Sequence, residues 1–214
     1  MTIAIPSLTR VPANERGITI GDFLVPIRIG ERLSPRLRHL VLIVAGALLI
    51  YLTARISIPL PGNPVPITGQ TFGVLVVGGA LGLRRGFAAS VLYVLLGVVG
   101  LPFFAEGKGG LSVIWGATGG YLVGFALASA LVGRLAELGW DRRFVGSVGA
   151  CALGNLAIYL VAVPWLAVVT GMDLASAIGT GVVPFLAGDV LKLLLAAAVF
   201  PVAWWVVGRR PDER

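Results

Sequence analysis

Two side chains of opposite charge lie inside an apolar run near the C-terminus of the sequence. Asp189 and Lys192 fall within residues 181–207, a run long enough to cross a membrane as a helix. Since they are three positions apart, a helix places them on one face, where they can contact each other or one ligand. Ionisable side chains at membrane depth cost roughly 2.5–3.5 kcal/mol each and usually mark a pathway or a site. A structural ion pair is the alternative, but nothing else polar in the run needs it for folding, so we favour a pair that faces a ligand.

Other polar side chains in the apolar runs suit recognition rather than catalysis. They are an amide, Asn155, and two phenols, Tyr121 and Tyr159. Aspartate accepts hydrogen bonds from N–H groups and lysine donates to carbonyl or carboxylate oxygens, so this set predicts a small, partly polar ligand that has both kinds of group. No histidine lies in the interior of an apolar run, and no spacing of metal ligands occurs. A Ser–Lys pair such as Ser90 with Lys192 has no supporting motif, so we predict neither an enzyme nor a metal site.

The composition predicts a membrane protein that crosses the bilayer several times. Apolar residues make up 57% of the chain and charged residues only 13%, with a mean hydropathy of +0.94; ordinary globular chains carry about 25% charged residues. The net charge of +7 could suggest nucleic acid, but the basic residues form short clusters between apolar runs and no basic stripe alternates with aromatic residues. We therefore exclude nucleic acid as a partner. The single cysteine, Cys151, cannot form an intramolecular disulfide.

The apolar runs predict six spans. They cover residues 39–60, 70–83, 86–100, 116–136, 144–170 and 181–207. The second and third runs are short, because a straight span needs about 20 residues. We expect these two to tilt or to end below the membrane surface, and short, glycine-rich runs of this kind often flank a cavity.

The distribution of arginine predicts the orientation. With a cytoplasmic N-terminus, the inside segments hold fourteen arginines and the outside loops hold one basic residue, Lys108. This positive-inside pattern places both termini in the cytoplasm. The basic residues that topology leaves unexplained are Arg55, Lys108 and Lys192, and with Asp189 they collect in the outer half of the bilayer. We therefore predict a polar cavity there.

Two further segments have distinct compositions. Residues 1–38 combine prolines with arginines and predict a flexible, basic cytoplasmic extension near anionic headgroups, although 18–29 also fit a short surface element. Residues 209–214 form a cytoplasmic tail, which leaves 39–208 as the membrane domain. Residues 101–115, here called the lid, join aromatic residues to a glycine-rich centre. That composition fits a hinged cover over a ligand as well as an ordinary interfacial loop.

Four motifs in this order resemble the BioY family, the biotin-specific substrate-binding (S) subunits of energy-coupling factor transporters. They are IPLPGNPVPITGQT at 58–71, GLPFFA at 100–105, TGGYLVGF at 118–125 and GDVLK at 188–192. The resemblance covers about residues 40–208. It implies an all-α integral membrane protein, a six-helix S-component bundle in a bacterial cytoplasmic membrane, with biotin enclosed near the outer face by the loops after the first and third spans.

The resemblance also implies roles for individual residues. Asp189 would accept hydrogen bonds from the ureido N–H groups of biotin with help from Asn155, while Lys192 would meet the ureido carbonyl or balance Asp189. The residues expected to pack the bicyclic ring are Trp165, Tyr121 and Tyr159, and those expected to close over it are Thr68, Gln70 and the 107–110 loop with Lys108 and Gly110. Biotin would be the ligand, and no cofactor is implied.

The partners implied by the resemblance are a transmembrane coupling subunit and a pair of ABC-type ATPases. The chain has no GxxxxGK[ST] motif, so any use of ATP must come from such partners. Related subunits dock through small residues spaced four apart on the first helix; here Ala45, Gly46, Ala47 and Ala54 occur, but Tyr51 follows Ala47 at that spacing. The apolar composition also predicts contact with membrane lipids. Glycine-rich helices can pack closely against each other, so a homo-oligomer is possible but is not indicated by the sequence. An S subunit for another vitamin and a structural membrane subunit without a ligand are the alternatives.

Overall fold

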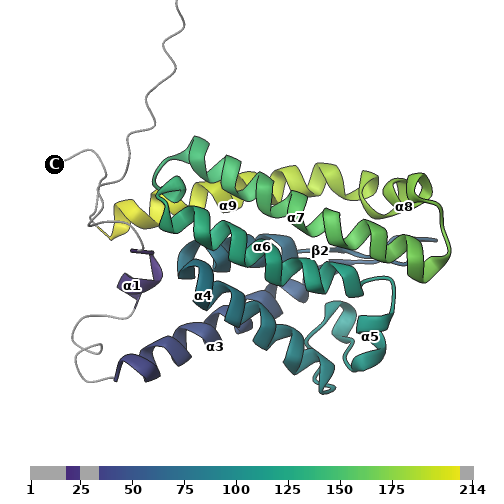
Figure 1. The fold of residues 1–214 in the computed structure, drawn as a ribbon, viewed down its shortest axis with the longest axis horizontal. Coiled ribbons are helices and arrows are strands. Elements are labelled where there is room, and N and C mark those ends of the chain that lie inside the picture. The colour runs from purple at the N-terminus through teal and green to yellow at the C-terminus, as the bar shows by residue number, and fades with distance from the viewer. Residues whose placement is uncertain (1–17, 25–33, 208–214) are drawn as a thin grey trace, which may run out of the picture.

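The fold is a bundle of helices with its long axis along the helices (Figure 1). The computed structural model describes residues 18–24 and 34–207. Its elements in chain order are α1 (Gly21–Leu24), α3 (Pro35–Ala54), β1 (Ser57–Ile58), β2 (Ile67–Thr68), α4 (Gln70–Val98), η2 (Ala105–Gly107), α5 (Leu111–Trp115), α6 (Gly119–Glu137), η3 (Trp140–Arg142), α7 (Phe144–Thr170), α8 (Leu174–Gly181), η4 (Val183–Phe185) and α9 (Leu186–Val206). Helix α4 packs against α3 and α6, and α7 packs against α6 and α9.

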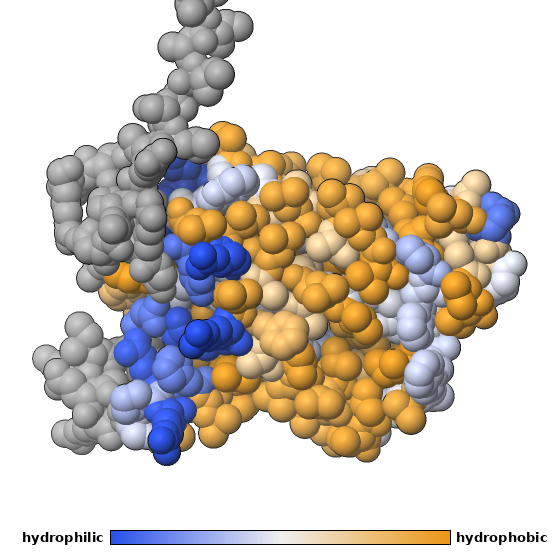
Figure 2. Space-filling model, in the orientation of Figure 1, coloured by the Kyte–Doolittle hydropathy of each residue, from blue (hydrophilic) through white to orange (hydrophobic). Residues whose placement is uncertain are grey.

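Within the described residues, five helical segments are long and apolar enough to cross a membrane. They are Pro35–Ala54, Gln70–Val98, Gly119–Glu137, Phe144–Thr170 and Leu174–Val206. On the face drawn in Figure 2, hydrophobic side chains form a belt between a strongly hydrophilic end and a paler opposite end. The pattern is that of a bundle whose middle faces lipid.

Helix α4 supplies two of the predicted spans because it folds back on itself at Gly82. The side-chain amide of Gln70 donates to the hydroxyl of Tyr93 at 2.5 Å, although 23 residues separate them; a straight helix would hold them about 35 Å apart. Gly82 has φ 82° and ψ 177°, which breaks the helix. The two short runs at 70–83 and 86–100 therefore form a helical hairpin, and the prediction of an all-α membrane bundle of six helical segments is confirmed.

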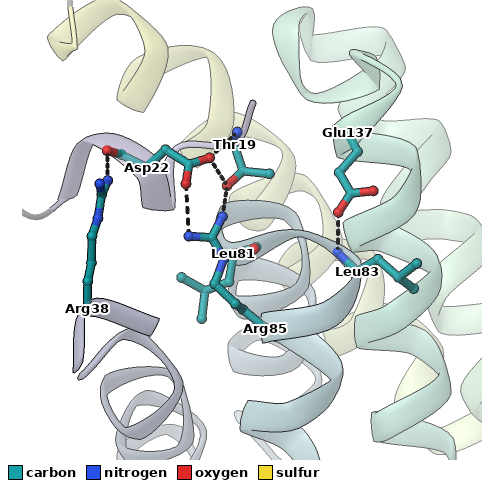
Figure 3. Close-up of polar contacts among 7 residues, drawn as sticks. All are labelled: Thr19, Asp22, Arg38, Leu81, Leu83, Arg85 and Glu137. Atoms are coloured by element: carbon teal, nitrogen blue, oxygen red, sulfur yellow. Dashed lines mark hydrogen bonds and ion pairs between the residues drawn. The ribbon is translucent and has the colours of Figure 1, made fainter. Parts of the chain in front are cut away.

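The turn at Gly82 is fixed by α6. Gly133 lies so close to it that a Cβ atom there would sit 2.4 Å from the carbonyl carbon of Gly82, so only glycine fits. Glu137, also on α6, accepts a hydrogen bond from the backbone N–H of Leu83 at 2.9 Å (Figure 3). This carboxylate caps the second half of α4, whose first N–H groups have no helical partner.

The first and last spans differ from the predicted ones. Helix α3 begins at Pro35, after a Ser34 cap, and ends at Ala54 because the chain then enters the two-stranded sheet, in which Ser57 pairs with Thr68 and Ile58 with Ile67. The prediction of one continuous helix over 181–207 is wrong. Pro184 lies in η4, and α9 begins only at Leu186. Asp189 therefore stands in the first turn of α9, not two turns inside a helix.

Residues 18–24 dock onto the bundle instead of extending away from it as a flexible tail. Asp22 accepts from Arg85 at 2.9 Å, and the backbone carbonyl of Asp22 accepts from Arg38 (Figure 3). Ile20 is 3% exposed. The remaining residues of the predicted 1–38 extension, apart from those at the start of α3, lie outside the described residues.

A buried carboxylate, Asp141, lies at the same end of the bundle as residues 18–24, since the neighbouring Arg142 donates to the carbonyl of Ile18 at 3.1 Å. Asp141 is 1% exposed and accepts a hydrogen bond from the indole N–H of Trp204 at 2.7 Å. Arg142 lies over the Trp204 ring, 3.4 Å from its centroid, and its Nε is 3.4 Å from Asp141. Burial raises the pKa of Asp141 to about 6, although the Trp204 bond and the Arg142 charge both oppose that shift.

This raised pKa predicts how stability depends on pH. The folded state holds the Asp141 proton up to about pH 6, while the unfolded chain releases it near 3.8. Stability from this group is therefore present at low pH and is lost as pH rises through that window. We expect thermal unfolding in detergent to occur about 3 °C higher at pH 5 than at pH 7, and Asp141→Asn to remove that difference. The same pH difference in both proteins would contradict the assignment.

Candidate ligand-binding cavity

A cavity of about 220 Å³ lies at the end of the bundle where α5 and α8 are drawn in Figure 1. Its walls come from the loop between the strands, the start of α4, the lid, α6, α7, η4 and α9. Eight of the ten predicted site residues line it: Thr68, Gln70, Lys108, Tyr121, Asn155, Tyr159, Asp189 and Lys192. Trp165 and Gly110 are not among the lining residues.

The two charges of α9 form a hydrogen-bonded pair in the cavity wall, in which Asp189 is buried and Lys192 is half-buried. Asp189 is 5% exposed, and Lys192 Nζ lies 2.5 Å from its Oδ1. Lys192 also donates to the backbone carbonyl of Thr68 at 2.9 Å. Asp189 accepts from the hydroxyl of Tyr159 through Oδ2 and from Thr71 through Oδ1 at 3.5 Å. The pair thus ties α9 to α7 and to the β2–α4 connection.

The position of Asp189 in the first turn of α9 has an electrostatic reason. The first N–H groups of a helix lack partners, and the helix dipole makes that end positive, which favours a carboxylate by about 0.3–1 kcal/mol. Pro184 has no N–H and fits the start of η4, so the break before α9 is encoded locally. The break brings the beginning of a helix, with Asp189 in its first turn, to the cavity wall.

Asn155 presents an acceptor without a partner. The residue lies on α7, is 9% exposed and lines the cavity. Its Oδ1 is buried and has no hydrogen-bond partner in the structure. A buried polar atom left unpaired costs about 1–3 kcal/mol, so native proteins rarely keep one unless it has another use. A ligand N–H group in the cavity would satisfy it.

Gln70 connects the floor of the cavity to the lid. Its Oε1 accepts from the hydroxyl of Thr68 at 2.9 Å, and its amide nitrogen donates to Tyr93. Tyr93 in turn donates to the backbone carbonyl of Phe103 at 3.1 Å. Both hydrogen-bonding groups of Gln70 are therefore used inside the protein, which makes it a residue that positions the lid.

The aromatic residues predicted to pack a ligand occupy different places. Tyr121 lines the cavity, while its hydroxyl donates to the carbonyl of Gly181 at 2.6 Å and so anchors the end of α8. Trp165 lies behind the lid, where its indole N–H donates to the carbonyl of Gly116 at 3.0 Å and its ring stacks on Trp115. Trp165 can support α5, whereas the ring of Tyr121 can contact a ligand directly.

The lid is folded into a tight loop followed by α5. The backbone N–H of Phe104 donates to the carbonyl of Lys108 at 3.0 Å, and Phe104 is buried. Gly110 has φ 97° and donates to the carbonyl of Gly97 at 2.7 Å, which fixes the lid to the end of α4. Arg55 at the end of α3 lies beside Gly107.

Several lining residues are not among the site residues that the sequence predicts. They are Thr71, Phe104, Glu106, Phe125, Ile158 and Phe185. Thr71, Phe104 and Phe125 lie within the motifs at 58–71, 100–105 and 118–125. Ile158 and Phe185 read as ordinary packing residues of apolar runs, and only the fold shows that they line the cavity. Glu106 could have been suspected, because it is an acid in a loop next to the predicted Lys108.

The site can recognise a ligand but has no metal centre in the part of the chain that is described. No three His, Cys, Asp or Glu side chains among residues 18–24 and 34–207 lie close enough to hold a metal ion. The cavity instead offers an unpaired amide oxygen, a neutral ion pair, phenol groups and an apolar wall. That set fits a small molecule with N–H donors, acceptor groups and an apolar body.

Comparison with known proteins gives the chain a family. The sequence model of the BioY family matches residues 28–209. The chain is 43% identical over 151 residues to the biotin transporter BioY of Thermotoga maritima, covering 71% of this chain and 86% of that protein. It is 37% identical over 157 residues to the probable biotin transporter BioY of Pyrococcus horikoshii, covering 72% and 90%.

A solved structure has the same fold. It is a crystal structure of the S-component for biotin from an ECF-type ABC transporter, with a TM-score of 0.73 and 24% sequence identity, and the match covers 79% of this chain and 93% of that one. The motifs, the six-segment bundle and these matches agree. The chain belongs to the BioY family.

Proposed function

We propose that this protein binds biotin and serves as the substrate-specific subunit of an energy-coupling factor transporter. The family and the names of the relatives support biotin as the ligand. The observation that carries the proposal is the unpaired Asn155 oxygen in a cavity that also holds Asp189. Two acceptors in one cavity suit the two N–H groups of a ureido ring.

The proposed pose uses the groups that the fold leaves available. The ureido N–H groups donate to Asn155 and Asp189, since a carboxylate has about four acceptor positions and the protein fills three. Lys192 has one of its three protons free of Asp189 and Thr68, and that proton can meet the ureido carbonyl. The ring system packs against Tyr121 and the apolar wall, and the carboxylate tail points to the lid.

The orientation and the partners belong to the same proposal. Arg85 follows the turn of α4 at Gly82, Arg134 lies in the last turn of α6 and Arg143 precedes α7, all at the end of the bundle away from the cavity. That distribution supports a cytoplasmic location for this end and for both termini. The cavity then lies towards the outside, where a transporter collects its ligand.

A coupling subunit and ABC-type ATPases would supply the energy. The small residues on α3 contribute less to such docking than their spacing suggests, because Gly46 and Ala47 are buried in the bundle and Gly46 faces Leu81 and Ala89. Ala45 is exposed among apolar residues such as Val44 and Leu48. A partner helix would therefore meet a face of α3 that is mostly aliphatic.

Binding of labelled biotin to the purified chain in nanodiscs tests the proposal. We expect saturable binding to one site per chain, with no competition from thiamine or riboflavin and no ATP turnover by the isolated chain. Absence of saturable biotin binding would refute the assignment of biotin as the ligand. Competition by another vitamin at equal concentration would favour an S subunit of different specificity, and ATP turnover would contradict the partner assignment.

A further inference from the structure

The lid carries its own pair of opposite charges at the cavity. Glu106 and Lys108 both line the cavity, and Lys108 Nζ lies 2.5 Å from Glu106 Oε2. Glu106 lies in η2 and Lys108 directly follows it, whereas Asp189 and Lys192 lie in α9. The cavity therefore has a second polar group, built from a different element, that the ureido ring does not need.

The backbone of the loop holds these two side chains together. Glu106 has φ 58°, and among the described residues it is the one non-glycine residue with a positive φ. L-residues adopt that conformation at a cost, so a position that keeps it without glycine often has a functional reason. The hydrogen bond from Phe104 N–H to the Lys108 carbonyl closes the loop around it. The loop thus presents both charges to the cavity in spite of the strain.

The two ion pairs differ in how firmly they are held. The side chains of Asp189 and Lys192 are 7% and 16% exposed, and Tyr159, Thr71 and Thr68 fix them. The side chains of Glu106 and Lys108 are 29% and 60% exposed. A water-exposed ion pair is weak and exchanges partners easily. Lys108 is therefore the cation of the cavity that a ligand anion can take over.

We propose that Glu106 is a specificity residue: in the empty cavity it pairs with Lys108, and a ligand with a carboxylate tail displaces it and takes Lys108 for itself. This rests on the proposed function and extends it from the ring of the ligand to its tail. A neutral tail cannot compete with Glu106, while a cationic tail would meet Lys108. The displaced Glu106 carboxylate stays near a cation, because Arg55 lies beside Gly107, the next residue of the loop.

Equilibrium binding of biotin and of its uncharged carboxamide separates this role from general effects on the site. We expect Glu106→Gln to bind biotin about two- to fivefold more tightly, because the competing carboxylate is gone and exposed pairs have energies of that order. Lys108→Met should bind biotin more weakly by a similar factor. Neither substitution should change the affinity for the carboxamide. In a Lys108→Met background, Glu106→Gln should no longer tighten biotin binding.

Asp173→Asn is the matched control. Asp173 is an exposed acid at the same end of the bundle, caps α8 through Ser176 and does not line the cavity. Asparagine caps helices as well as aspartate does, so this variant removes one negative charge without altering the fold. It should change the affinity for neither ligand. An equal gain in biotin affinity from Asp173→Asn would show that only the overall charge matters and would overturn the proposal.

Other outcomes also decide the question. The proposal is wrong if Glu106→Gln leaves biotin affinity unchanged, or if it changes the affinities for biotin and the carboxamide by the same factor. If Glu106→Gln does not fold, Glu106→Gly removes the same carboxylate and suits the positive φ, and the same shifts are required of it. A wild-type chain that binds no biotin refutes the proposed function itself, whereas a wild type that binds biotin with unaltered selectivity in the variants refutes only the role of Glu106.

Discussion

Asp189→Asn is expected to weaken biotin binding by about 100-fold, because among the described residues it removes the one cavity-lining carboxylate that comes from the bundle helices. Asparagine has nearly the same shape and can still accept from Tyr159, and Lys192, which loses its counter-ion, keeps its hydrogen bond to the carbonyl of Thr68. The variant should therefore fold, with a lower thermal stability than wild type because one charge of the pair is left unpaired. What is lost is the charge that strengthens the bond to a ureido N–H. Titration of labelled biotin into wild type and variant in nanodiscs measures the effect, with thermal unfolding as the check on folding.

Lys192→Met and the double variant show whether the pair serves the fold or the ligand. Lys192→Met leaves Asp189 as a buried carboxylate without its counter-ion, which costs about 3–5 kcal/mol, so we expect a clear loss of thermal stability. Asp189→Asn combined with Lys192→Met should recover that stability but not the binding. If Asp189→Asn alone binds biotin normally, the pair is structural and another group reads the ureido ring.

Asn155→Leu should lower biotin affinity by about tenfold or more while leaving the protein as stable as wild type or more stable. The affinity falls because a ligand N–H loses its acceptor in the cavity, at a cost of about 1–3 kcal/mol. Stability does not fall because Oδ1 of Asn155 has no partner in the empty protein. Leucine is similar in size and carries no polar atom that needs satisfying.

Asn63→Leu is the control for the prediction that Asn155→Leu lowers biotin affinity without lowering stability. Asn63 donates to the carbonyl of Thr180 at 2.9 Å and accepts from the N–H of Val65 at 2.9 Å, so its amide already has partners in the protein. Removing it should lower the thermal unfolding temperature, unlike removal of Asn155. Binding isotherms and unfolding curves for the two variants together test the inference. A destabilised Asn155→Leu protein with unchanged biotin affinity would refute the role of Asn155 as a ligand acceptor.

The sequence predicted the spans well wherever apolar length alone decides them. Residues 144–170 were predicted as one span, and α7 covers the same residues. The short runs at 70–83 and 86–100 were predicted as separate, and α4 is indeed broken at Gly82, one residue before the end of the first run. Predictions failed where a helix ends for local steric reasons inside an apolar run. Residues 181–207 read as one hydrophobic stretch, but the Pro184 region breaks it before Leu186.

The polar residues of the site could be predicted from the sequence, but their arrangement around the cavity could not. Charged and amide side chains in apolar runs are costly, so Asp189, Lys192 and Asn155 could be identified from type and position alone. Lys108 could be identified because it is the one basic residue of the loops that the arginine distribution predicts to lie outside. Trp165, like Tyr121, is an aromatic residue with a polar group that could contact a ligand. Its indole group instead donates to the carbonyl of Gly116 and stacks on Trp115 behind the lid. Residue type does not tell which side of a wall a ring occupies.

The sequence by itself therefore determined the class of protein, the helical segments and the polar groups available for a ligand, because each of these follows from the local cost of placing side chains in a bilayer. Only the tertiary structure decided that Asp189 stands in the first turn of α9, that Asn155 keeps a free oxygen and that Glu106 holds Lys108. Those facts depend on where separate helices and the lid meet. The packing of distant segments sets which hydrogen bonds are already made, and so which groups remain for the ligand.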